Sequence, residues 1–184
     1  MKINFYAFSA IYLHEMDRFR RTLTQSVLSP VLTTSLYFIV FGSVIGGYVE
    51  KIDGISYGSY IVPGLLMLTL LTQSISNTSF GIFFPKFNGT IYEILAAPIS
   101  TLEVVLAFVG AGATKTLIVS IIIFITSLFF VDVQVKYPLL MIFLLILVAF
   151  TFALFGFLIG LMSSDFEQMS IIPTLFVTPM VFLG

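Results

Sequence analysis

Five long apolar runs, separated by short polar segments, limit the fold of this chain more than any other feature of its sequence. A helix needs about 20 residues to cross the roughly 30 Å apolar core of a bilayer. The charged residues make up 9% of the chain, against roughly 25% in an average soluble domain. We therefore predict an all-α, polytopic transmembrane helix bundle that forms one domain, with crossings at residues 30–47, 57–84, 101–131, 138–162 and 166–184.

The composition removes several classes of function. The chain has no cysteine and a single histidine, His14, so neither a Cys/His metal cluster nor a Ser-His-Asp triad is expected. Its net charge of -1 and the lack of a basic stripe argue against a nucleic-acid partner. No convergent set of catalytic groups lies at one depth, so the chain is not expected to be an enzyme.

Residues 1–28 predict an amphipathic helix that lies at the membrane surface. Aromatic and apolar residues recur at steps of three and four: Phe5, Phe8, Tyr12, Met16, Phe19 and Leu23. Charged residues fall mostly on the other side: Glu15, Asp17, Arg18 and Arg21. Such a helix either joins the bundle to a cytoplasmic partner or anchors it in the inner leaflet. Ser29 and Pro30 predict a helix restart, because Pro is tolerated at the first helical position.

The second predicted crossing carries polar residues at helical spacing: Thr69, Gln73, Ser76 and Asn77. Polar residues in a transmembrane helix face other helices or a water-filled cavity rather than lipid. The row is therefore either a set of interhelical hydrogen bonds or a translocation surface. Pro63 and Gly64 predict a kink in the same helix.

The polar segment 85–99 predicts a short helix outside the membrane. Thr90 and Glu93 have the spacing of a capping box, and Pro98 ends the helix. The same spacing recurs twice, with Ser100 and Glu103 opening the third crossing and Ser164 and Glu167 opening the fifth.

Small residues and one lysine mark the third crossing. Residues 110–116 have a superficial likeness to a phosphate-binding loop, but Thr114 stands where the Walker pattern requires glycine before the lysine. We expect the small residues to permit close helix packing, as do Gly156 and Gly160 at their four-residue spacing. Lys115 is expected to snorkel to the inner headgroups or to pair with another helix rather than to bind substrate, which is the remaining alternative for an ionisable group inside a membrane helix.

The distribution of Lys and Arg predicts a cytoplasmic N-terminus. With that orientation, five basic residues lie inside and two lie outside. The inner ones are Lys2, Arg18, Arg20, Arg21 and Lys86, and the outer ones are Lys51 and Lys136.

Several motifs together carry a resemblance to a known family. They are Phe41-Gly42, Val62-Pro63-Gly64, Asn88-Gly89-Thr90 with Glu93, Leu95 and Pro98, Gly156 with Gly160, Asp165-Phe166-Glu167, and Thr178-Pro179. In this order they resemble the membrane subunit of ABC-2 type exporters over essentially the whole chain. The resemblance implies a bacterial plasma (inner) membrane permease that pairs with a second permease copy and with a cytosolic ABC ATPase. ATP and Mg would then bind the ATPase, with no cofactor in this chain.

The resemblance also implies six crossings, so the chain is expected to be incomplete at its C-terminus. Residues 85–99 would form the coupling loop that contacts the ATPase, through Lys86, Phe87, Gly89, Thr90, Ile91, Tyr92, Glu93, Leu95 and Pro98. The implied cargo is a hydrophobic drug or a lipid-linked glycan. The alternative is an ion-coupled secondary transporter. Such proteins place ionisable groups near the middle of the membrane, whereas the acidic residues of this chain cluster at helix ends and in loops, which argues against this alternative.

Overall fold

A computed structural model describes residues 4–45, 54–133 and 135–183, and this part of the chain contains helices and no strand. The helices are α1 (Phe5–Arg21), α2 (Leu23–Tyr37) with a π-helical continuation (Phe38–Ile45), α3 (Tyr57–Phe87), α4 (Ile91–Ala96), α5 (Thr101–Ser127), α6 (Pro138–Met162) and α7 (Phe166–Leu183). The predicted all-α bundle is thus confirmed. The predicted end of the first crossing at Gly47 lies outside the described residues, as do Lys2 and Lys51.

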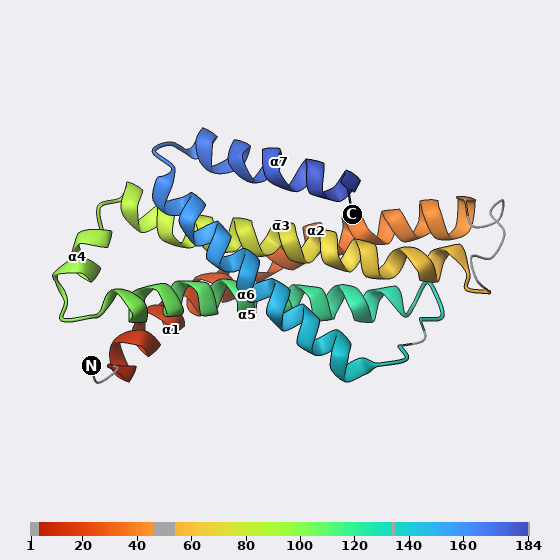
Figure 1. Ribbon diagram of the computed structural model, residues 1–184, viewed down its shortest axis with the longest axis horizontal. Coiled ribbons are helices and arrows are strands. Elements are labelled where there is room, and N and C mark those ends of the chain that lie inside the picture. The colour runs from red at the N-terminus through yellow and green to blue at the C-terminus, as the bar shows by residue number, and fades with distance from the viewer. Residues whose placement is uncertain (1–3, 46–53, 134, 184) are drawn as a thin grey trace.

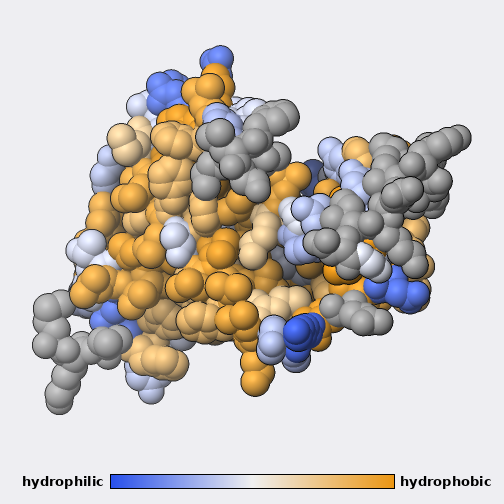
Figure 2. All heavy atoms as spheres, turned by 45° about the vertical axis from the view of Figure 1, so that its right-hand side comes forward, coloured by the Kyte–Doolittle hydropathy of each residue, from blue (hydrophilic) through white to orange (hydrophobic). Residues whose placement is uncertain are grey.

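Four of the helices in the described residues are long and apolar enough to cross a membrane: Leu23–Phe41, α3, α5 and α6. Helix α7 has 18 residues, and its crossing of the membrane stays a prediction. Figure 2 shows a face on which hydrophobic residues form a broad area, with hydrophilic residues toward its margins. Such a surface is suited to lipid rather than to water.

Helices α3 and α5 form the centre of the bundle (Figure 1). They run in opposite directions and are joined at one end by α4, while α6 crosses them obliquely and α7 returns along the bundle next to α3. Helices α1 and α2 follow one another along α5. The buried residues Leu70, Val109 and Ala149 come from three different helices and belong to one apolar core.

Glycines set the close approach of α6 to α3, as predicted. A Cβ atom at Gly156 would lie 2.5 Å from the backbone oxygen of Ile75, and one at Gly160 would lie 2.5 Å from the backbone oxygen of Ser79. Gly112 similarly lies against Thr78 and brings α5 close to α3. Small residues permit such close backbone contact, and dispersion forces drive helix association in lipid.

The first helix break differs from the prediction. The helix is interrupted at Thr22, whose amide donates to the carbonyls of Arg18 and Phe19, and α2 starts directly afterwards at Leu23. Pro30 therefore lies inside α2 rather than at a helix start. Its ring removes one backbone donor, which a membrane helix tolerates when its neighbours compensate.

Two other helices end at residues that differ from the prediction. Helix α3 continues through Pro85 to Phe87, three residues beyond the predicted end of the crossing, and α5 ends at Ser127 rather than at residue 131. Helix α6 has the predicted bounds, Pro138–Met162.

Candidate functional site

The connection between α3 and α5 is a hydrogen-bonded hairpin. Gly89 has φ +78°, in the left-handed region that favours glycine, and turns the chain into α4. Ser100 then caps α5: its hydroxyl accepts from the Glu103 amide at 3.4 Å, and its own amide donates to Glu103 Oε2 at 2.9 Å. This capping box was predicted and is confirmed. Glu103 Oε1 also accepts from the Asn4 amide at 2.5 Å, so the start of α1 is fixed to the same point.

The other two predicted capping boxes are wrong. The Thr90 hydroxyl donates to the Pro85 carbonyl at 3.4 Å, and its side chain makes no cap hydrogen bond. The backbone of Thr90 is helical, whereas a cap residue usually has extended dihedrals. At the third site the Ser164 amide donates to Gln168 Oε1 at 3.0 Å, so Gln168 takes the place predicted for Glu167.

Helix α4 presents an apolar outer face. Tyr92 and Leu95 are 73% and 67% exposed, and Phe87, just before the turn, is 61% exposed. Ile91 and Ile94 instead pack against the apolar core. Ile91, which was predicted to contribute to the contact surface, therefore faces inward and fixes α4 to the bundle. Glu93 and Pro98 are exposed beside the outer face, as the prediction requires.

Lys86 makes hydrogen bonds within the chain, to the end of α6. Its ammonium donates to the carbonyls of Leu161 and Ser163, at 2.7 Å and 2.8 Å. These groups lie at the end of α6, where carbonyls lack helical donors. The predicted role of Lys86 in orienting a partner thus competes with a role in capping α6. Phe166 at the start of α7 packs edge-on against Phe87 with ring centroids 4.8 Å apart, so the ends of three helices meet here.

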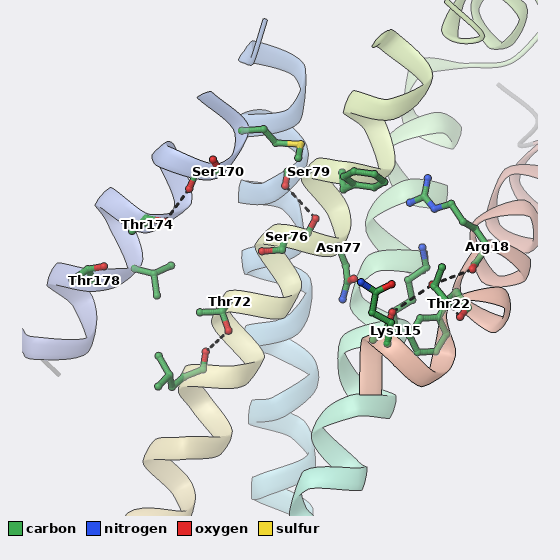
Figure 3. A pocket seen from close by; sticks show the side chains of 17 residues that line it. Arg18, Thr22, Thr72, Ser76, Asn77, Ser79, Lys115, Ser170, Thr174 and Thr178 are labelled. Carbon is green, nitrogen blue, oxygen red and sulfur yellow. Dashed lines mark hydrogen bonds between the residues drawn. The ribbon is translucent and has the colours of Figure 1, made fainter. Parts of the chain in front are cut away.

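A cavity of about 860 Å³ lies between α1, α2, α3, α5 and α7 (Figure 3). The four residues of the polar row predicted on α3 line two different cavities. Ser76 and Asn77 line this cavity, whereas Thr69 and Gln73 line a second one of about 290 Å³ between α2 and α3. Asn77 Nδ2 also lies 3.4 Å from Gln73 Oε1 and 3.5 Å from Thr116 Oγ1. The row therefore supplies both interhelical hydrogen bonds and cavity walls.

Sequence reasoning missed the hydroxyls on the other walls of the larger cavity. Ser170, Thr174 and Thr178 follow one another at four-residue steps along α7 (Figure 3). Thr22 and Ser26 line the cavity from the break before α2 and from α2 itself. The regular spacing on α7 was a usable signal, because residues four apart share one helix face.

Three charged side chains meet beside this cavity. Glu15 Oε2 accepts from Lys115 Nζ at 2.7 Å and from Arg18 NH2 at 2.8 Å. The side chains of Glu15 and Lys115 are 2% and 3% exposed. Glu15 was predicted to lie on the outer, polar side of the first helix, and this is wrong. Among the alternatives for Lys115, pairing with another helix is confirmed, and Lys115 also lines the larger cavity.

Comparison with known proteins gives the family of the chain. Residues 6–184 match the family described as ABC-2 type transporter. The chain belongs to the ABC-2 type transporter family. It is 37% identical over 184 residues to the inner membrane transport permease YadH of Escherichia coli K12, a match that covers all of this chain and 72% of that protein.

Less similar relatives include proteins named nodulation protein J from two bacteria. The Azorhizobium caulinodans protein is 20% identical over 185 residues, which cover all of this chain and 73% of that protein. The Rhizobium leguminosarum bv. viciae protein is 21% identical over 181 residues, which cover 95% of this chain and 68% of that protein. No solved structure matches the chain. Membership of the ABC-2 family identifies the chain as the membrane subunit of an ABC transporter, which works with an ABC ATPase.

Proposed function

We propose that the chain is the permease of an ATP-driven exporter in the bacterial inner membrane, with two copies and two separate ATPase subunits in each assembly. The name of its relative YadH, inner membrane transport permease, supports the location. In this assignment ATP and Mg²⁺ bind the separate ATPase subunits, and membrane lipid covers the outer apolar surface of the helices. The cargo is a hydrophobic drug or a lipid-linked glycan.

The outer face of α4 is the contact point for the ATPase. This is the observation that carries the proposal: Tyr92 and Leu95 are strongly exposed, although Ile91 and Ile94 of the same short helix are packed inward. Aromatic and aliphatic side chains of this kind form the centres of protein interfaces. Because α4 joins α3 to α5 directly, a displacement of α4 moves both central helices.

The larger cavity is the translocation surface. Its walls combine hydroxyl and amide groups with apolar side chains such as Leu68, Phe80 and Val177. Binding cavities for small molecules have this composition, with apolar walls and a few polar groups that fix orientation. Ser76 and Asn77 remain in this assignment, and Thr69 and Gln73 extend the polar surface into the neighbouring cavity.

The N-terminus and α4 lie on the cytoplasmic side. The excess of basic residues at one set of helix ends supports this orientation. The chain direction gives α1, α4 and the start of α7 the same end of the bundle (Figure 1). Helix α1, with Phe5 and Leu13 exposed, then lies at the inner leaflet.

An ion-coupled secondary transporter is the alternative. Such proteins place titratable groups near their cargo site, and Glu15 lies beside the cavity. Its Oε2 already accepts hydrogen bonds from Lys115 and Arg18, however. Transport driven by an ion gradient in the permease alone would favour this alternative.

Co-purification of the ATPase subunit tests the proposal. Leu95→Asp places a charge in the exposed apolar face and is expected to abolish co-purification, while the permease itself stays folded. Tyr137→Asp is the matched control, because Tyr137 is also exposed (62%) but precedes α6 at the opposite end of the bundle. Equal recovery of the ATPase with both variants would contradict the assignment of α4.

A further inference from the structure

The charged residues that line the larger cavity are both basic. Among its described lining residues these are Arg18 from α1 and Lys115 from α5. They approach from different helices and share Oε2 of Glu15, which lies behind them in the buried interface between α1 and α5. The charged side chains on the cavity wall are therefore all positive.

The charges in this cluster do not cancel. One carboxylate offsets one of two cations, so the cluster carries one net positive charge. Lys115 is buried at 3% exposure, whereas the Arg18 side chain, which also lines the cavity, is 26% exposed. Arg18 donates to Glu15 through NH2. Because a guanidinium has five N–H donors, Arg18 has further donors for a ligand. A positive charge removed from bulk water is stabilised by a hydrogen-bonded anion.

The surroundings of Arg18 suit the head group of an amphiphile. The Arg18 guanidinium carbon lies over the Phe80 ring, 5.3 Å from its centroid, a cation–π contact that leaves the other N–H groups of Arg18 for hydrogen bonds. Hydroxyls of Thr22, Ser26 and Ser170 line the same cavity. Apolar side chains line the remainder: Phe19, Leu68, Met169 and Val177. A polar head beside Arg18 would find hydrogen-bond donors, and an apolar tail along these residues would find apolar contacts.

We propose that this cavity takes as cargo an amphiphile with an anionic head group, whose oxygens accept hydrogen bonds from Arg18, in preference to an uncharged amphiphile. The inference rests on the proposed function of the cavity as the translocation surface and narrows its cargo. With the N-terminus in the cytoplasm, Arg18 meets the head group from the inner leaflet.

Direct binding tests the anion preference without the ATPase. The purified full chain, in an uncharged maltoside detergent, is titrated with dodecyl phosphate and with an uncharged dodecyl ethoxylate, and bound ligand is counted by native mass spectrometry. We expect Arg18→Gln to weaken dodecyl phosphate binding about tenfold, equivalent to about 1.4 kcal/mol. Arg18→Lys keeps the charge and is expected to lose much less affinity.

Two further variants control for surface binding and for misfolding. Arg20 lies on the same helix but is 79% exposed and faces Asp17 at 3.9 Å, so Arg20→Gln is expected to leave binding unchanged. Thr174→Phe fills the cavity from α7, away from the charged cluster, and is expected to remove binding while α1 stays intact. Equal binding by Arg18→Gln and Arg20→Gln, or undiminished binding by Thr174→Phe, would overturn the proposal.

Transport separates cargo from a static lipid ligand. The permease and its ATPase are reconstituted in vesicles with a fluorescent phosphate-headed lipid or an uncharged analogue, and ATP-dependent movement between leaflets is measured by quenching. We expect the anionic probe to move faster and Arg18→Gln to remove this preference. Movement of the uncharged probe alone would overturn the inference and leave the exporter intact. Absence of ATP-dependent movement for every probe would overturn the proposed function as well.

Discussion

Lys115 Nζ in α5 lies 2.7 Å from Glu15 Oε2 in α1, and both side chains are buried. The pair joins residues that are 100 positions apart in the sequence. Together with the contact of the Asn4 amide with Glu103, it fixes α1 to α5 at two points, one at the start of α1 and one in its second half. Helix α1 therefore moves with the bundle rather than as a separate surface anchor.

Breaking this pair on one side is expected to destabilise the protein. Lys115→Met leaves Glu15 with Arg18 alone, and removal of one partner from a buried ion pair costs about 3 kcal/mol or more. The midpoint of thermal unfolding in detergent measures the effect. Glu15→Gln combined with Lys115→Met removes both charges of the pair and is expected to recover part of the loss. Lys136→Met, at an exposed position, is the control, and an equal loss there would contradict the account.

Close packing of α6 on α3 makes Gly156 intolerant of side chains. Gly156→Leu forces its Cβ into the backbone of Ile75 and is expected to cost about 3 kcal/mol through overpacking. Gly64→Leu is the matched control, since a Cβ at Gly64 meets nothing within 4 Å and leucine has the higher helix propensity. Unfolding midpoints in detergent report both changes. Similar midpoints for the two variants would show that α6 does not approach α3 this closely.

Lys86 is expected to stabilise the end of α6 more than it assists ATPase binding. Lys86→Met removes charge-assisted hydrogen bonds to the carbonyls of Leu161 and Ser163, and each such bond contributes about 1.5–3 kcal/mol. Faster hydrogen exchange at the end of α6, with ATPase co-purification retained, is the predicted result. Loss of the ATPase without a change in hydrogen exchange would return Lys86 to the role predicted from the sequence. Lys86→Arg keeps the donors and serves as the control.

Sequence patterns predicted those features that depend on hydrophobicity and local spacing. The bounds of α6, the short helix α4 and the capping box of Ser100 and Glu103 follow from runs and motifs of a few residues. Interactions between distant segments were missed. Glu15 lies three residues after Tyr12 and four before Phe19, on the buried stripe of α1, but its polarity suggested the opposite side. Two cations, Arg18 of the same helix and Lys115, 100 positions away in the sequence, make that burial favourable.

The candidate site was predictable to a similar extent. The exposed faces of Tyr92 and Leu95 agree with the predicted contact surface, whereas Ile91 turned inward because α4 needs an anchor in the core. On α3, periodicity identified the polar row. It did not show that α2 and α7 supply the facing hydroxyls of the cavities, since facing walls depend on the packing of segments far apart in the chain.

The side of the membrane on which α4 lies is the most direct test of the central claim. The chain has no cysteine, so Leu95→Cys and Tyr137→Cys each give a single labelling site at opposite ends of the bundle. We predict that a membrane-impermeant maleimide labels the Tyr137→Cys variant in intact cells but labels the Leu95→Cys variant only in inverted vesicles. Addition of the ATPase to those vesicles is expected to reduce labelling of the Leu95→Cys variant. Labelling of the Leu95→Cys variant from outside intact cells would contradict the account.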